Sequence, residues 1–262
     1  MLHFLTTGPN FPYAYYIGVK SASLVGEVKL WYSEKPNTDL GNYWNKIVKE
    51  VPTEEIFMPD EDFFIFHHRY DTWCRVSKFG YLIWKIIAKH GGTVMGLDSI
   101  TLKAFDDLLG DADMLVGRDA EDQWPTSYCM HGATCKKDSF LAQKIFEDSE
   151  RAMRGEETGG PVEKIWRDGY IRFGAAGIIP MLNNIAKYKD KVKVNVADYG
   201  VLGGYRHDGS PFYLFEKGQK LLNLDARTIP FYATWQHKKF DIINPETIKG
   251  TLLGDLVERL GI

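Results

Sequence analysis

The run Gly91-Gly92-Thr93-Val94-Met95-Gly96-Leu97-Asp98 decides how the fold of this chain is interpreted. An apolar segment with helical spacing, residues 71–90, precedes it, and the two glycines are a strong helix stop. A short apolar run, residues 93–97, then delivers Asp98 at its C-terminal end. This order predicts a helix, a buried strand and a carboxylate at the edge where open α/β sheets bind ligands.

Short apolar runs alternate with helical patterns on both sides of this stretch. The predicted strands are residues 2–6, 27–32, 55–58, 93–97, 114–117, 128–135 and 192–196. The predicted helices are residues 13–24, 42–50, 71–90, 140–153, 174–188 and 244–260. Such alternation is typical of a mainly parallel sheet covered by helices on both faces. Since no repeat or composition break divides the chain, we expect a single α/β domain over residues 1–262.

The composition excludes several classes of function. The 262 residues carry 32 basic and 35 acidic side chains, a formal charge of −3, which gives no global attraction to nucleic acid or membrane. No apolar run approaches the length of a transmembrane segment, and the N-terminus does not have the pattern of a signal peptide. Three cysteines (Cys74, Cys129 and Cys135) cannot all pair within one chain, which favours a reducing compartment. We therefore expect a cytoplasmic protein, or one of the host cytoplasm if it is viral.

The central run resembles the Gly-Gly-(Ile/Val)-Tyr-Leu-Asp-x-Asp segment of sugar-nucleotide glycosyltransferases with the GT-A fold. Residues 100–109 look like the Leu-Lys-Pro-Leu-Asp-x-Leu-Leu that often follows it in mannosyl-, galactosyl- and capsular-polysaccharide transferases. The resemblance covers residues 1–120 and implies a GT-A-like (nucleotide-diphospho-sugar transferase) domain. Residues 1–120 would be its nucleotide-sugar-binding half, and residues 121–262 its acceptor half and closing helix.

The chain departs from this pattern in two places. The first Asp of the Asp-x-Asp pair is Gly96 here. Relatives also carry a Ser-Asp pair and an Arg on the preceding helix, and those places are taken by Phe79, Gly80 and Ile83. Both departures concern groups that help to bind the donor, so they bear on donor identity and on activity.

The resemblance implies a metal-dependent donor site built around Asp98. That carboxylate would bind Mn²⁺ or Mg²⁺ on the diphosphate of a UDP- or GDP-sugar, because hard cations prefer oxygen ligands. His237 would be a second metal ligand and Lys238 would approach a phosphate. The alternatives are a helix N-cap for Asp98, with Ser99–Thr101 opening a turn, and a solvated basic loop for the other two.

Other candidate residues follow predicted strands. Thr6, Thr7 and Gly8 end the first strand, where this fold usually binds base and ribose, although a structural turn explains them equally well. Asp119 and Asp122 follow the strand at residues 114–117 and are candidate catalytic residues near an acceptor hydroxyl.

Two further motifs have simpler explanations. A literal Asp-x-Asp at residues 111–113 precedes a strand, so we expect a solvated turn at the opposite end of the sheet. Cys129, His131 and Cys135 could bind zinc, but no fourth ligand is evident.

These observations predict a glycosyltransferase, hexosyl or pentosyl, that moves a sugar from a nucleotide donor to a glycan or other hydroxyl acceptor, with retention of configuration. One alternative is a degenerate, non-catalytic protein that binds nucleotide or glycan. Another is a phage-type glycosyltransferase acting on hydroxylated bases in DNA, which the charge of −3 does not favour.

Overall fold

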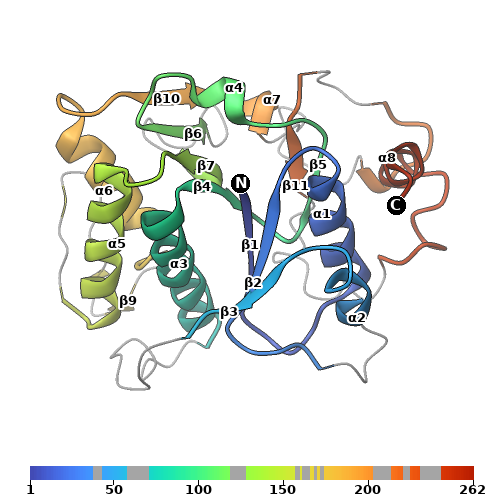
Figure 1. The fold of residues 1–262 in the computed structure, drawn as a ribbon, viewed down its shortest axis with the longest axis horizontal. Helices are drawn as coiled ribbons and strands as arrows, with labels where there is room; N and C mark the ends of the chain where they lie inside the picture. The colour runs from blue at the N-terminus through green and yellow to red at the C-terminus, as the bar shows by residue number, and fades with distance from the viewer. Residues whose placement is uncertain are drawn as a thin grey trace.

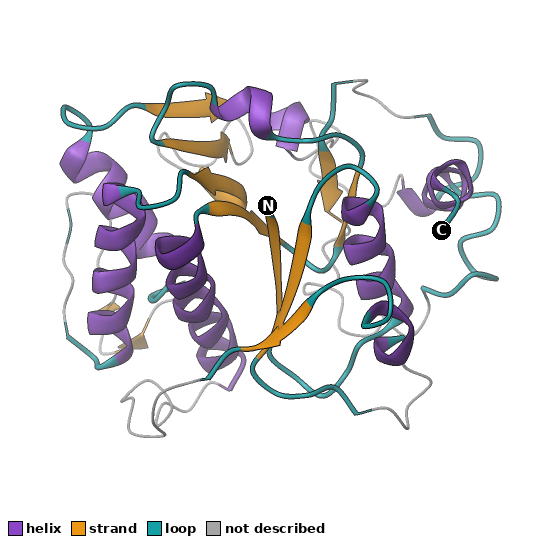
Figure 2. Cartoon of the chain, viewed as in Figure 1, coloured by secondary structure: helices purple, strands orange, loops and turns teal. Residues whose placement is uncertain are grey.

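A computed structural model describes residues 1–37, 43–57, 71–118, 128–156, 160, 166–167, 170–171, 174–202, 214–220, 225–230 and 243–262. The strands are β1 (Leu2–Thr6), β2 (Val28–Tyr32), β3 (Thr53–Glu55), β4 (Gly92–Met95), β5 (Ser99–Thr101), β6 (Met114–Arg118), β7 (Tyr128–Cys135), β8 (Trp166–Arg167), β9 (Tyr170–Ile171), β10 (Val194–Ala197) and β11 (Thr228–Pro230). The helices are α1 (Tyr13–Ser23), α2 (Trp44–Ile47), α3 (Asp71–His90), α4 (Asp106–Leu109), α5 (Phe140–Met153), α6 (Ile178–Tyr188), α7 (Tyr199–Leu202) and α8 (Leu252–Leu260). Figures 1 and 2 show their arrangement.

The main sheet has seven strands in the order β10-β6-β7-β4-β1-β2-β3. Every neighbouring pair is parallel except those that involve β7, which runs antiparallel to both β4 and β6. The prediction of an α/β fold with a mainly parallel sheet flanked by helices is therefore confirmed.

Helices cover both faces of this sheet, and the alternation of side chains along β1 explains why. Phe4 joins the apolar cluster that includes residues of α1 and α8, whereas Leu5 joins the cluster that includes residues of α3, α5 and α6. Successive side chains of a strand point to opposite faces, so one short strand contributes to both cores. In Figure 1, α3, α5 and α6 lie on one side of β1 and α1 and α8 on the other.

Several predicted boundaries are wrong by a few residues. The third strand spans Thr53–Glu55 and not 55–58, and the second helix is limited to Trp44–Ile47. The closing helix begins at Leu252 and not near residue 244, because Gly250 has a φ of +73° and Thr251 forms the N-cap. The Thr251 hydroxyl accepts a hydrogen bond from the Gly254 N–H at 3.2 Å.

The segment after β4 also differs from its prediction. The strand ends at Met95, and Ser99–Thr101 forms β5, a buried strand that pairs antiparallel with β11. Asp98 is therefore not the N-cap of a helix, because the residues after it continue into a strand. Within the described part of the chain, no helix combines the length and the apolar character needed to cross a bilayer.

Candidate functional site

Asp98 lies in the turn between β4 and β5, at the C-terminal edge of the parallel strands. Phe4 of β1 pairs with Met95 of β4, so the ends of these two neighbouring strands leave the sheet together. Thr6, Thr7 and Gly8 therefore lie at the same edge as the turn. The Thr6 carbonyl accepts the Ser33 N–H at 3.1 Å, which ties in the end of β2. The predicted candidates at the ends of β1 and β4 thus share one edge of the sheet.

The turn that carries Asp98, residues 96–99, is closed by its own side chains and by a histidine of β7. The Ser99 hydroxyl donates to the Gly96 carbonyl at 2.7 Å. The Gly96 N–H donates to Nδ1 of His131 at 2.9 Å. Since Nδ1 accepts, the neutral ring carries its proton on Nε2. That nitrogen is 3.1 Å from Oγ1 of Thr228, whose hydroxyl donates to the Ile100 carbonyl at 3.2 Å.

The His131 ring is held in its neutral form. Burial lowers its pKa from 6.5 to about 4, because a charged imidazolium would lose its hydration in this interior position. Both ring nitrogens are also occupied by hydrogen bonds. His131 consequently acts here as a fixed hydrogen-bonding group rather than as a free base.

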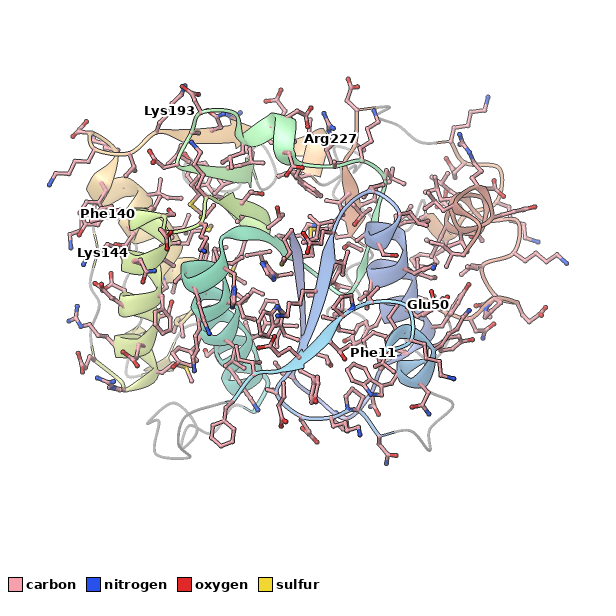
Figure 3. All side chains as sticks on the ribbon, viewed as in Figure 1. Phe11, Glu50, Phe140, Lys144, Lys193 and Arg227 are labelled. Atoms are coloured by element: carbon pink, nitrogen blue, oxygen red, sulfur yellow. The ribbon has the colours of Figure 1, made fainter. Side chains whose placement is uncertain are left out.

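Strand β11, which carries Thr228, is itself anchored. The guanidinium of Arg227 donates to the Ala104 carbonyl at 2.9 Å and forms an ion pair with Asp107 at 2.6 Å. Figure 3 labels Arg227 at the edge of this region. Arg227 directly precedes β11, and Ala104 and Asp107 follow β5. Their contacts therefore support the register of the pair, in which Ile229 lies opposite Ile100.

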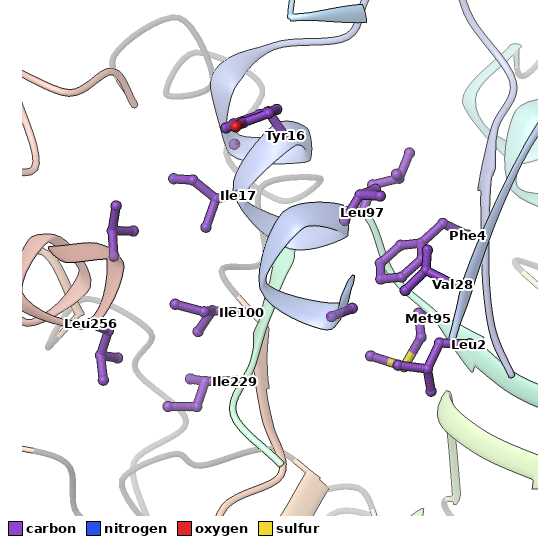
Figure 4. Packing of buried hydrophobic residues seen from close by; sticks show 14 of the residues in the cluster. Leu2, Phe4, Tyr16, Ile17, Val28, Met95, Leu97, Ile100, Ile229 and Leu256 are labelled. Carbon is purple, nitrogen blue, oxygen red and sulfur yellow. The ribbon is translucent and has the colours of Figure 1, made fainter. Parts of the chain in front are cut away.

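Helix α1 packs directly on the same turn. A Cβ on Gly18 would collide with the carbonyl oxygen of Leu97 and lie 2.9 Å from that of Ser99, so only glycine permits this approach. One turn further along α1, the Ser21 hydroxyl accepts the Thr101 N–H at 2.9 Å. Figure 4 shows Ile17 of α1 near Ile100 and Ile229, the apolar contact that accompanies these polar ones.

Tyr15 of α1 is a neighbour of the Asp98 carboxylate that sequence patterns did not reveal. Burial raises the pKa of the Tyr15 phenol well above 10, and the negative charge of Asp98 raises it further. The phenol therefore stays protonated at any physiological pH. It places a neutral hydroxyl beside the carboxylate.

Gly96 stands where the resemblance places a first aspartate, and the structure shows what fills that space. A Cβ at this position would lie 2.9 Å from Oδ1 of Asp98 and 3.1 Å from Nδ1 of His131. The carboxylate and the imidazole thus close over the glycine from two sides. A side chain at position 96 would have to displace one of them.

The second departure, on α3, has a similar explanation. A Cβ on Gly80 would lie 2.6 Å from the Cα of Gly177 and 2.9 Å from the Ala176 carbonyl. Trp84, one turn further, donates from Nε1 to the Gly177 carbonyl at 3.2 Å. Ile83 is fully buried. This part of α3 therefore packs against the segment before α6 instead of presenting polar groups.

Several predicted site residues lie outside the described residues: Asp119, Asp122, His237 and Lys238. In the described ranges, no group of three or more His, Cys, Asp or Glu is arranged to hold a metal ion. Asp98 is partly exposed at the sheet edge. Zinc binding by His131 is not supported, because both of its nitrogens are bonded and Cys135 is fully buried.

The literal Asp-x-Asp lies at the opposite end of the sheet, as predicted. Asp111 is exposed and forms an ion pair with Lys193 at 2.6 Å, and Asp113 accepts the Lys193 N–H at 2.8 Å. These residues precede β6 and join it to the start of β10. Their role is structural.

No protein-family model and no curated protein matches this chain. Among solved structures, it is similar to the PaToxG glycosyltransferase at 13% identity, over 72% of this chain and 68% of that chain, with a TM-score of 0.45. Similarity to the glycosyltransferase GlyE of Streptococcus pneumoniae TIGR4 reaches 15% identity over 94% of this chain, with a TM-score of 0.42; this chain spans 51% of that one. The galactosyltransferase LgtC, solved with donor and acceptor sugar analogues, is similar at 13% identity over 95% of both chains, with a TM-score of 0.37. All three are glycosyltransferases.

Proposed function

We propose that this chain is a glycosyltransferase that moves a sugar from a nucleotide-diphosphate donor to an acceptor hydroxyl. The observation that carries the proposal is the Asp98 turn. A partly exposed carboxylate stands at the C-terminal edge of a mainly parallel sheet, on a turn whose backbone is held by contacts from α1 and β7 and is followed by a strand paired with β11. This is the edge at which open α/β sheets bind ligands.

The chain's own groups would divide the work as follows. Asp98 would hold Mn²⁺ or Mg²⁺, and a bound cation would neutralise charge on the departing diphosphate. Thr6 is buried, so Thr7 and the backbone of Gly8 would contact the base and ribose, with Thr6 behind them; no atom lies within 4 Å of a Cβ placed on Gly8. The UDP- or GDP-sugar is therefore expected to lie across the ends of β1 and β4.

The remaining roles are proposed from the sequence resemblance. His237 and Lys238 would approach the metal and a phosphate, and Asp119 and Asp122 the acceptor hydroxyl. With retention of configuration, the departing phosphate can take the acceptor proton, so the reaction does not require a separate protein base. A glycan is the proposed acceptor class, and DNA receives no support from the charge of −3.

Asp98→Asn tests the proposal. The substitution keeps the shape of the side chain and removes the charge, so the fold should survive, while Mn²⁺-dependent nucleotide binding weakens and turnover is lost. The assay is hydrolysis of a panel of UDP- and GDP-sugars with MnCl₂, together with thermal unfolding of both proteins. Full activity in the Asn variant would contradict the role of Asp98, and an inactive wild-type protein would contradict the enzyme.

A non-catalytic protein that binds nucleotide is the second candidate. Gly96 and the apolar packing of Gly80 and Ile83 favour it, because these positions and Phe79 carry no polar group here, whereas their counterparts bind donor in the resembled enzymes. A wild-type protein that is stabilised by UDP or GDP with MnCl₂ but hydrolyses no donor would support this candidate over the enzyme.

A further inference from the structure

We propose that His131 is a positioning residue that holds the residue 96–99 turn, and with it Asp98, in the orientation needed to meet a donor diphosphate. The inference rests on the proposed function of Asp98. It concerns a histidine of β7 whose two ring nitrogens face Gly96 and Thr228.

The first step is the contact that His131 makes with the turn. The Gly96 N–H is the first backbone donor after β4 ends, so the sheet no longer supplies its partner. Nδ1 of His131 accepts it at 2.9 Å. His131 belongs to β7, the antiparallel neighbour of β4. Its bond to Gly96 therefore attaches the beginning of the turn to the main sheet.

The second step is the anchor on the other side of the ring. Nε2 bonds Oγ1 of Thr228 at 3.1 Å, and that hydroxyl donates to the Ile100 carbonyl at 3.2 Å. Through Thr228, the ring thus connects Gly96, two residues before Asp98, to Ile100 in β5. The Thr228 bond therefore orients the ring, and the Gly96 bond is the one that reaches the turn.

The third step is proximity to the carboxylate itself. Nδ1 of His131 and Oδ1 of Asp98 lie 3.1 Å and 2.9 Å from the position that a Cβ of Gly96 would occupy. The absence of a side chain at Gly96 lets both groups approach the same backbone atom.

The two ring nitrogens can be tested separately. In His131→Asn the amide oxygen can occupy the place of Nδ1 and keep the Gly96 bond, whereas in His131→Gln a polar atom reaches the place of Nε2 and keeps only the Thr228 bond. If the Gly96 contact positions the turn, the Asn variant should retain function and the Gln and Ala variants should lose it.

Thr134→Val is a matched control for general loss of stability. Thr134 and Thr93 share a buried hydrogen bond of 2.9 Å between the same two strands, β7 and β4. The Thr134 hydroxyl also donates to the Gly132 carbonyl at 3.1 Å. Neither bond involves residues 96–99, so their loss should weaken the pairing of β4 and β7 without releasing Asp98.

The experiment combines two measurements on wild type, His131→Ala, His131→Asn, His131→Gln and Thr134→Val. Hydrogen–deuterium exchange follows the Gly96 amide and the residue 96–101 segment, and calorimetric titration follows binding of UDP or GDP as a function of MnCl₂. In the Ala and Gln variants we expect the exchange rate of the Gly96 amide to rise about tenfold. The MnCl₂ concentration needed for half-maximal nucleotide binding should rise by about the same factor, the scale of one lost hydrogen bond. The Asn and Thr134→Val variants should stay near wild type.

The outcomes separate the positioning role of His131 from the proposed function. Equal effects in the Ala, Asn and Thr134→Val variants would overturn the positioning role, because they would follow stability alone. Unchanged exchange at Gly96 in the Ala variant would overturn it as well. A wild-type protein that binds neither nucleotide with MnCl₂ would contradict the proposed function, while the exchange data would still decide whether His131 fixes the turn.

Discussion

His3 should make the stability of this protein sensitive to mild acid. The side chain is fully buried in β1, and its Nδ1 accepts a hydrogen bond from Nε1 of Trp31 at 3.0 Å. Burial, with smaller contributions from the positive charges of the N-terminal amine, His90 and Lys29, lowers the pKa of His3 from 6.5 to about 4. The folded protein therefore resists a proton that the unfolded chain accepts near pH 6.5.

The sign and the size of the effect follow from this difference. A folded pKa below the unfolded value means that the contribution is complete above pH 6.5 and is lost as the pH falls toward 4. Each pKa unit corresponds to about 1.4 kcal/mol, so the full loss is about 3 kcal/mol. At pH 5, where the unfolded chain is almost fully protonated and the folded one is not, the loss is about 2 kcal/mol.

The assay is urea unfolding of wild type and His3→Asn at pH 7.5 and pH 5. The Asn oxygen can replace Nδ1 as acceptor for Trp31 but does not titrate, so the variant should lose about 2 kcal/mol less on acidification than wild type. His90→Gln is the control, because His90 also has a lowered pKa but is more exposed. A variant that keeps the full wild-type loss between these pH values would refute the reasoning.

Two further predictions concern packing and capping. Gly80→Ala should destabilise the protein by about 1–3 kcal/mol despite the better helix propensity of alanine, since its Cβ would meet the backbone of Gly177 at 2.6 Å. A variant that is more stable than wild type in urea unfolding would contradict the close approach of α3. Thr251→Ala should lower the free energy of unfolding by about 1 kcal/mol because it removes the N-cap of α8, and Thr251→Ser should restore most of this loss. Equal stability of the Ala and Ser variants in thermal unfolding would show that the cap contributes nothing.

Much of the fold could be predicted because its signals are local. β1, α3, β7 and α5 have the predicted bounds. Each has a periodic pattern with a clear end, such as the glycines after His90 or the Ser139 N-cap, whose hydroxyl accepts the Ala142 N–H at 3.2 Å. The edge location of Asp98 followed from the same local order.

The parts that sequence reasoning missed depend on distant pairings. β5 has three residues and is a strand only because β11, more than a hundred residues later, pairs with it. Likewise, His131 was weighed as a zinc ligand because its neighbours in sequence are cysteines. Its actual partners, Gly96 and Thr228, are 35 and 97 positions away, and no local pattern indicates them.

Each departure from the glycosyltransferase pattern is explained by its own local packing. At position 96 the space is closed by Asp98 and His131, and at position 80 by the backbone of Gly177. Ile83 is part of the core that this close approach creates. A side chain at position 96 would require the side chains of Asp98 and His131 to move, whereas one at position 80 would meet the backbone of Gly177. If this chain binds a nucleotide donor, recognition must come from the ends of β1 and β4 and from the carboxylate of Asp98. The interactions that hold the turn carrying Asp98 are then as important for binding as the carboxylate itself.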